Sequence, residues 1–377
     1  MNIAFVNRML GIHRGGGEIW DLQIADYLED LGADITFYVG KPIQSQLPEP
    51  PDQFRYVEVP TLHLRDLAYA APIGVGGVLN DIDSRVFSNR VMKHLLNHTH
   101  DIIHVNSDPR FGRLQSKLDV PLTIKMNGPP HSLWYDYINP FTTSSQLFKY
   151  FDEVIATGIT SEEIQSDCPR GVHTINPGVN TDLFTPSGPA CETEGPTIMF
   201  VGRFVPAKNL SFLIEGFRKV KNQCPNAQLW LIGDGPLKHR IESKVDTLGM
   251  ANSVRFLGYI ENDQLPPYYR AADIFTLSSR TENHPIALME ALSCGTPVVA
   301  PDIGWIPHMI TDEREGMLFS KKDINEFVTS HISLLESPDT RTQMAHSART
   351  RAEANFEWKE RAERLFDVFT RVIERSG

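Results

Sequence analysis

Residues 185–202 read TPSGPACETEGPTIMFVG, and this stretch divides the chain into two halves. Its first part, 185–196, is rich in Pro and Gly and lacks hydrophobic periodicity, which is typical of a linker. Its second part, 197–202, is a short apolar run of the length of a buried strand. One structural pattern therefore ends in this stretch and a second begins, so we expect domains over residues 1–186 and 187–357.

Short apolar runs alternate with helical segments on both sides of this linker, for example the helical segments 18–31 and 85–97. Such alternation is typical of βαβ units, so we expect an α/β protein with mostly parallel sheets covered on both faces. The last stretch, 358–374, predicts an amphipathic helix with Phe366 and Phe369 on its apolar side. The strand candidates are IAFVN, ADITFYV, DIIHVN, LTIKMN and EVIAT before the linker, and TIMFVG, LWLIGDG, VRFLG, DIFTLSS and PVVAP after it.

The composition excludes several classes of protein. The chain has 377 residues, of which 41% are hydrophobic and 22% charged, as in ordinary globular proteins with two domains. A net charge of −11 opposes binding to nucleic acid. The cysteines show no CxxC spacing, which fits reduced thiols in a cytoplasmic protein. They are Cys168, Cys191, Cys224 and Cys294.

No segment predicts export or a membrane span. The start, MNIAFVNRML, runs directly into a strand without a signal-peptide pattern, and the apolar stretch 67–79 is Gly-rich and too short to cross a bilayer. We expect residues 67–79 to pack in the core. The alternative is that they contact a lipid-linked acceptor. We expect a solvated face for the basic helix 85–98, and peripheral contact with the inner membrane face stays open.

Two acids flank a predicted helix start in SRTENHPIALMEALSCGTPVVA, residues 279–300. Asn283 can cap this helix and Pro285 suits its first position, so its N-terminal amides form a site for a phosphate. Glu290 leans toward the N-terminus and can reach a neutral diol such as ribose. Glu282 precedes the helix and can accept hydrogen bonds from a second set of hydroxyls. This layout suits a nucleotide sugar; the alternative is that both acids are solvated surface charges.

The loop VGRFVPAKN, residues 201–209, adds two cations after a predicted strand. Arg203 and Lys208 could neutralise a diphosphate and stabilise its charge as it departs. The alternative is that both side chains are simply exposed to solvent and bind no ligand. The turn GDGP, residues 233–236, is by itself only a chain reversal.

Taken in order, the motifs VGRFVPAKNL, LWLIGDGP, Glu282–x7–Glu290 and EALSCGTPVVA resemble the retaining glycosyltransferases of family 4 (glycosyl transferases group 1). HRGGGEIWDLQIADYLEDLGADITFYV and INPGVNTDLFTP resemble the first half of that family more loosely, so the resemblance spans nearly the whole chain. It implies the GT-B fold: two Rossmann-like domains facing a central cleft. The second domain would bind the nucleotide sugar, the first the acceptor, and the C-terminal helix, 358–377, would cross back to the first domain.

The resemblance also implies roles for individual residues. Arg203 and Lys208 would hold the diphosphate, and Glu282 the donor-sugar hydroxyls. Asn127 stands where the family often has His, and His131 could serve in its place; Asn283 and His284 replace a more usual Gly–Phe. The substrate-binding residues implied are Gly16, Gly17, Asn127, His131, Asn283, His284, Pro285, Ile286, Ala287 and Glu290.

The implied reaction is transfer of a hexosyl unit from a nucleoside-diphosphate sugar to an acceptor hydroxyl with retained configuration. A UDP-sugar is the favoured donor and GDP-mannose the next, and the acceptor is a sugar, a glycan or a lipid-linked molecule. No DxD-type motif follows a predicted strand, so no metal cofactor is expected. The alternatives are an epimerase or phosphorylase of the same architecture and a non-catalytic nucleotide-sugar binder. An NAD(P) oxidoreductase is disfavoured because GIHRGGGE is not GxGxxG.

Overall fold

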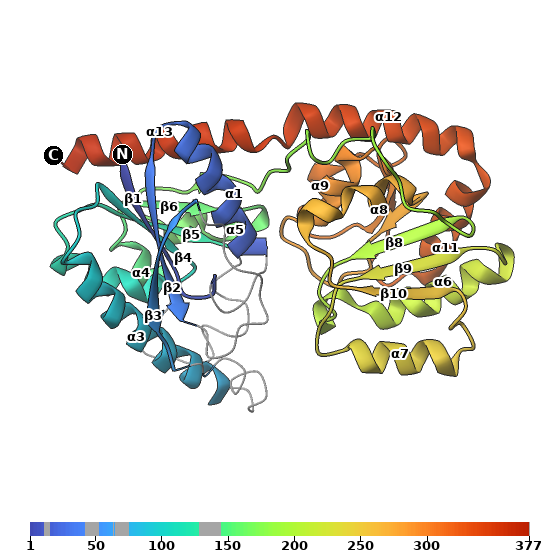
Figure 1. Ribbon diagram of the computed structural model, residues 1–377, viewed down its shortest axis with the longest axis horizontal. Helices are drawn as coiled ribbons and strands as arrows, with labels where there is room; N and C mark the ends of the chain where they lie inside the picture. The colour runs from blue at the N-terminus through green and yellow to red at the C-terminus, as the bar shows by residue number, and fades with distance from the viewer. Residues whose placement is uncertain (11–15, 42–52, 63, 65–74, 128–144, 377) are drawn as a thin grey trace. The chain divides into compact units, whose positions relative to one another are not determined.

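The computed structural model describes residues 1–10, 16–41, 53–62, 64, 75–127 and 145–376. The chain forms two compact units, Met1–Pro177 together with Trp358–Gly377, and Gly178–Glu357 (Figure 1). The change of unit therefore comes earlier in the chain than residue 186, where the sequence placed it. Val179 and Phe184 are buried in the core of the second unit, so apolar burial and not the Pro/Gly composition sets this boundary.

The first unit holds a seven-stranded parallel sheet in the order β3-β2-β1-β4-β5-β6-β7. The strand order changes direction between β1 and β4, which is the arrangement of a doubly wound sheet. All five predicted strands of this half are present, and β3 and β7 are additional. The strands are β1 (Asn2–Asn7), β2 (Asp34–Lys41), β3 (Arg55–Pro60), β4 (Ile102–Asn106), β5 (Leu122–Met126), β6 (Glu153–Ala156) and β7 (His173–Thr174).

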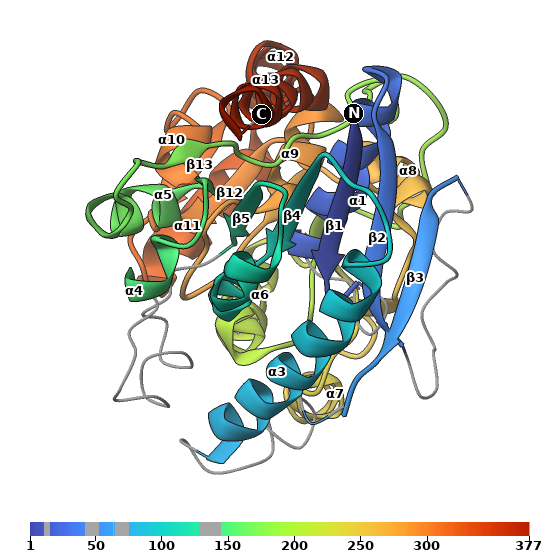
Figure 2. The ribbon, with the colours of Figure 1, turned by 90° about the vertical axis from the view of Figure 1, so that its left-hand side faces the viewer.

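Helices cover both faces of this sheet. Ile3 and Phe5 of β1 face a core shared with two helices, α1 (Gly16–Asp30) and α13 (Trp358–Ser376). The alternate residues of β1 face a second core with α3 (Val75–Leu95), and Figures 1 and 2 show α3 on the side opposite α13. The remaining elements are η1 (Pro109–Lys117), α4 (Ser145–Phe148), α5 (Ile159–Ile164) and η2 (Gln165–Asp167).

Helix α3 begins at Val75, well before its predicted start at Arg85, and includes the Gly-rich residues 75–79. Residues 67–74 of the apolar stretch lie outside the described part of the chain. Val78 is 46% exposed, so the prediction that this stretch packs in the core is wrong at that residue.

The second unit holds a six-stranded parallel sheet in the order β10-β9-β8-β11-β12-β13. The five predicted strands are confirmed, and β13 is additional. The order changes direction between β8 and β11, as between β1 and β4 in the first unit. The strands are β8 (Thr197–Val201), β9 (Gln228–Ile232), β10 (Val254–Gly258), β11 (Ile274–Thr276), β12 (Val298–Pro301) and β13 (Gly316–Phe319).

The helices of this unit pack on the sheet through one continuous apolar core. They are η3 (Pro206–Lys208), α6 (Leu210–Gln223), α7 (Lys238–Thr247), η4 (Asn262–Gln264), α8 (Pro266–Ala271), α9 (Ile286–Ser293), α10 (Ile306–Met309), α11 (Ile324–Glu336) and α12 (Pro338–Asn355).

The predicted amphipathic C-terminal helix is α13, and it returns to the first unit after the chain has completed the second. Trp358 and Phe369 are fully buried there, while Phe366 is half-buried against the same core. Trp358 also packs edge-on against Trp20 of α1, at 6.3 Å between ring centroids. None of the described helices combines the length and the apolar character that a membrane span requires.

Candidate active site

The loops that follow β8 and β11 lie together at the carboxyl edge of the second sheet. These strands are neighbours at the change in strand order, which is where open α/β sheets bind ligands. The Arg280 N–H donates to the Ala207 carbonyl at 2.7 Å, and the Ser278 hydroxyl donates to the Lys208 carbonyl at 2.8 Å. Two predicted site segments, 201–209 and 279–287, are therefore held side by side.

Lys208 and Glu282 form an ion pair between these loops. The Lys208 Nζ lies 2.5 Å from Glu282 Oε1, and the Ser279 hydroxyl donates to the same oxygen at 2.6 Å. Only 9% of the Glu282 side chain is exposed, so the surface-charge alternative is wrong for this acid. The structure thus brings together two residues that the sequence had placed on different parts of a ligand.

Gly304, in the loop after β12, supports the backbone of Glu282. Its φ of +53° lies in the left-handed region, and a Cβ atom there would come within 1.9 Å of the Glu282 carbonyl oxygen. A third loop at the same sheet edge therefore packs closely against the backbone that carries this carboxylate.

Arg203 is exposed on the loop after β8, and the GDGP turn holds its backbone in place. The Phe204 N–H donates to the Asp234 carbonyl at 2.8 Å. A Cβ atom on Gly233 or Gly235 would lie within 2.7 Å of the backbone of residues 202–204. The sequence treated this turn as a simple reversal, but its glycines permit the close approach that positions Arg203.

Helix α9 starts one residue later than predicted, at Ile286. Pro285 is the N-cap residue and offers no side-chain acceptor, so the expected cap by Asn283 is wrong. The helix start remains suited to an anion through its backbone amides. Asn283 and His284 are half-buried, and Ile286 and Ala287 pack partly against the core.

Glu290 is buried inside α9, with 4% of the residue exposed. Its Oε1 accepts a hydrogen bond from Asn262 Nδ2 at 2.6 Å, and its Oε2 accepts from the Tyr269 hydroxyl at 2.7 Å. Burial raises the pKa of Glu290, while the two hydrogen bonds oppose this shift. Burial, followed by the charge of Glu290, raises the pKa of Tyr269 as well. The surface-charge alternative is therefore wrong for Glu290 too.

Sequence reasoning did not find Asn262 and Tyr269. Both residues lie in the segment YIENDQLPPYY, which directly follows β10. The only signal for them in the sequence is that this segment leaves the carboxyl end of a predicted strand.

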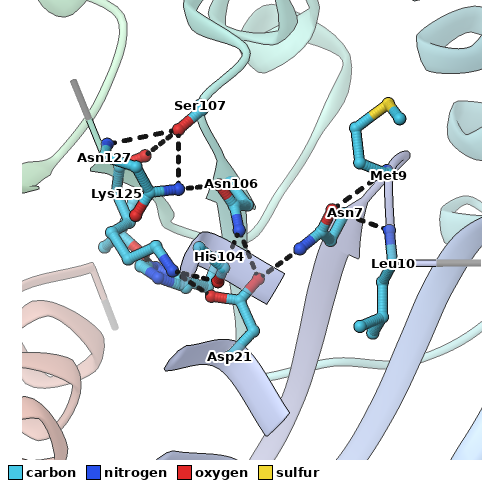
Figure 3. A network of polar contacts seen from close by, with 11 residues as sticks. Asn7, Met9, Leu10, Asp21, His104, Asn106, Ser107, Lys125 and Asn127 are labelled. Atoms are coloured by element: carbon cyan, nitrogen blue, oxygen red, sulfur yellow. Dashed lines mark hydrogen bonds and ion pairs between the residues drawn. The ribbon is translucent and has the colours of Figure 1, made fainter. Parts of the chain in front are cut away.

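In the first unit the structure brings Gly17 and Asn127 together. A Cβ atom on Gly17 would lie 2.3 Å from Asn127 Nδ2. Gly16 and Gly17 open α1, so a plain flexible turn is the wrong reading for these two glycines. Asn127 follows β5, where its Nδ2 donates to Asn106 Oδ1 at 2.7 Å and to the Ser107 hydroxyl at 3.0 Å (Figure 3). His131 lies outside the described residues.

In the part of the chain that the structure describes, no group of three or more His, Cys, Asp and Glu side chains could hold a metal ion.

Comparison with known proteins finds a family similarity in the second unit. Residues 188–351 match the family model described as glycosyl transferases group 1. The chain is 31% identical over 225 residues to D-inositol 3-phosphate glycosyltransferase 2 of Catenulispora acidiphila, covering 55% of this chain and 52% of that protein. It is 29% identical over 211 residues to a GDP-mannose-dependent alpha-(1-6)-phosphatidylinositol monomannoside mannosyltransferase of Mycolicibacterium smegmatis, covering 52% and 55%. These alignments span about half the length of the curated relatives.

Solved structures match over the whole chain. Sucrose-phosphate synthase from Thermosynechococcus elongatus has a TM-score of 0.80 at 20% identity, with 99% of each chain covered. The Anabaena protein Alr3699/HepE in complex with UDP-glucose has a TM-score of 0.73 at 18% identity, covering 98% of this chain and 99% of that one. These likenesses confirm the GT-B fold that the sequence motifs implied.

We predict that Gly304→Ala destabilises the second unit more than Gly249→Ala. Both glycines have a left-handed backbone, so each substitution costs roughly 1–2 kcal/mol. Only Gly304 meets a neighbouring backbone atom, whereas a Cβ on Gly249 meets nothing within 4 Å. The midpoint of thermal unfolding should fall further for Gly304→Ala. Equal shifts for the two variants would show that Gly304 does not support Glu282.

Proposed function

We propose that this chain, whose residues 188–351 match the glycosyl transferases group 1, is a retaining hexosyltransferase of family 4. It transfers a hexosyl unit from a nucleoside-diphosphate sugar to the hydroxyl of a sugar, a glycan or a lipid-linked acceptor, in the biosynthesis of a glycan, polysaccharide or glycolipid. A UDP-sugar is the favoured donor and GDP-mannose the next. The observation that carries the proposal is the grouping of Arg203, the Lys208–Glu282 pair and Glu290 around one sheet edge.

The Lys208–Glu282 pair can bind phosphate and sugar at the same time. An ammonium group has three N–H donors, so Lys208 can donate to a phosphate oxygen while it remains bonded to Glu282. The carboxylate of Glu282 retains acceptor capacity for a hydroxyl of the donor sugar. The pair would therefore fix the position of the sugar relative to its leaving group.

Glu290 suits the ribose of the donor. An ionised carboxylate offers about four lone-pair positions, of which Asn262 and Tyr269 occupy one on each oxygen. One further hydrogen bond to each oxygen matches two neighbouring ribose hydroxyls. Because the site is buried, these hydrogen bonds are stronger than they would be in water.

In the proposed reaction the bond between the anomeric carbon and the diphosphate oxygen breaks. The acceptor hydroxyl oxygen forms the new bond on the same face, and its proton passes to the departing phosphate oxygen. Negative charge grows on that oxygen, and Arg203, Lys208 and the amides at the start of α9 would stabilise it without a metal ion. The acceptor would bind the first unit, where Asn127 would hydrogen-bond a sugar hydroxyl, and the backbone of Gly16 and Gly17 would approach the phosphates. We propose a cytoplasmic location, with peripheral contact at the inner membrane face left to experiment.

A donor and acceptor panel tests this function. Purified protein would be incubated with UDP- and GDP-sugars and with sugar, glycan and lipid-linked acceptors, with and without EDTA. We expect release of nucleoside diphosphate and a product of retained configuration, measured by NMR, in both conditions. Isomerisation of the donor without acceptor would favour an epimerase, and binding without turnover a non-catalytic binder. Activity that EDTA abolishes and Mg²⁺ restores would contradict the metal-independent mechanism.

We predict that Lys208→Ala lowers kcat by on the order of a hundred- to a thousandfold, the range measured for preorganised charges in other enzymes. The loss should appear in kcat because the charge on the leaving phosphate grows as the bond breaks. The matched control is Lys244→Ala, which removes a lysine of similar exposure, 25% against 23%, that also pairs with a glutamate, Glu215. If both variants keep kcat within about threefold of the wild-type value, Lys208 does not stabilise the leaving group.

We also predict that nucleotide affinity depends on the ionisation of Glu290. Burial raises its pKa, so affinity should fall as the pH drops through that raised value and the carboxylate is protonated. Tyr269→Phe removes a hydrogen bond to the carboxylate and should move this loss to higher pH. Calorimetric titration across acidic and neutral pH measures the shift, with Tyr268→Phe as the control. Identical pH profiles for the two variants would contradict the role of Glu290.

A further inference from the structure

A buried ion pair lies against the first turns of α1, and the proposed reaction makes no direct use of it. The side chains of Asp21 and Lys125 are both fully buried and form an ion pair. Lys125 Nζ also donates to the Gly17 carbonyl at 2.9 Å and lies 3.9 Å from the centroid of the Trp20 ring. Burial lowers the pKa of Lys125, and the Asp21 carboxylate opposes that shift. Such groups are almost never buried without a partner, so the pair needs an explanation.

The pair joins α1 to the ends of three strands. Asp21 Oδ2 accepts hydrogen bonds from Asn7 Nδ2 at 2.7 Å and from Asn106 Nδ2 at 2.6 Å (Figure 3). Asn7 ends β1, Asn106 ends β4 and Lys125 belongs to β5. This is the carboxyl edge on both sides of the change in strand order, so the pair sets where α1 begins relative to that edge.

The charge of Asp21 also sets the direction of the side-chain amides beyond it. A carboxylate only accepts hydrogen bonds, so Asn106 must turn its Nδ2 toward Asp21. Its Oδ1 then faces Asn127, which must present its own Nδ2. A neutral residue at position 21 would weaken this constraint, leaving the orientation of Asn106 to its longer hydrogen bond, 3.3 Å, to the Gly17 carbonyl.

We infer that Asp21 and Lys125 are positioning residues for substrate binding in the first unit. Through Gly17 they fix the first turn of α1, and through Asn106 they fix the amide of Asn127. The inference rests on the proposed function for the assignment of Gly17 and Asn127 to the substrate. Fully buried ion pairs contribute little net stability compared with apolar residues of similar volume, so orientation is what this pair adds.

The decisive variant is the double substitution Asp21→Leu/Lys125→Met, which replaces the pair with apolar side chains. We expect this variant to fold with a lower midpoint of thermal unfolding, because Asn7 Nδ2, Asn106 Nδ2 and the Gly17 carbonyl lose hydrogen-bond partners. Amide hydrogen exchange in the first turn of α1 should become faster. Transfer should lose roughly a hundredfold in kcat, the effect of a misplacement of about 1 Å. Nucleotide affinity, which we assign mainly to the second unit, should change far less than kcat.

Thr123→Val is the matched control. Thr123 is fully buried on β5, two residues before Lys125, and its described hydrogen bonds join His104 and the Ile103 carbonyl. Its loss removes a buried polar contact from the same sheet without altering the Asp21–Lys125 pair. We expect wild-type exchange in α1 and wild-type kcat.

A folded double variant with kcat within about threefold of wild type and unchanged exchange in α1 would overturn the inference. If the double variant does not fold, Asn106→Ala decides, because it leaves both charged residues in place and cuts the link to Asn127. A wild-type kcat in that variant would equally overturn it. Failure of the proposed function looks different: the wild-type protein would transfer no sugar, and the exchange measurement would still show whether the pair holds α1.

Discussion

Parallel strand pairing is the constraint on which the rest of this protein depends. All strands of a parallel sheet end at the same edge, so the loops that follow them are gathered there whatever their separation in sequence. Lys208, Glu282 and Gly304 come from loops after three different strands and meet at one edge of the second sheet. In the first unit the same constraint gathers Asn7, Asn106 and Asn127.

The described acids at these edges differ in the partner that compensates their burial. Glu282 has a cation, Lys208, which is still partly exposed to solvent. Glu290 instead accepts hydrogen bonds from two neutral donors, Asn262 and Tyr269. Asp21 pairs with Lys125, and both side chains are fully buried, so the two charges act on the neighbouring protein groups and not on solvent. The same functional group is therefore buried in three different electrostatic environments, which its neighbours determine.

The sequence predicted the parts of the fold that are locally encoded. The buried strands are continuous apolar runs, and Glu282 and Glu290 both belong to one short segment that contains α9. Edge strands were missed because they lack this signal: β3 is mostly exposed or half-buried, and β7 has only two residues. The partners of Glu290 and Asp21 were missed because they lie far away in the chain. Tyr269 is 21 residues from Glu290, and Lys125 is 104 residues from Asp21, so only strand order brings them together.

Helix α13 imposes an order on the biogenesis of this protein. It follows the whole second unit in the chain, yet Trp358, Leu365 and Phe369 complete the core of the first. During synthesis on the ribosome, the first unit emerges early but lacks this helix until the second unit has been made. The apolar face around Trp20 then stays uncovered, so the second unit, which is continuous in sequence, can finish folding before the first. A nascent chain stalled before Trp358 would therefore be a substrate for chaperones that bind exposed apolar surface.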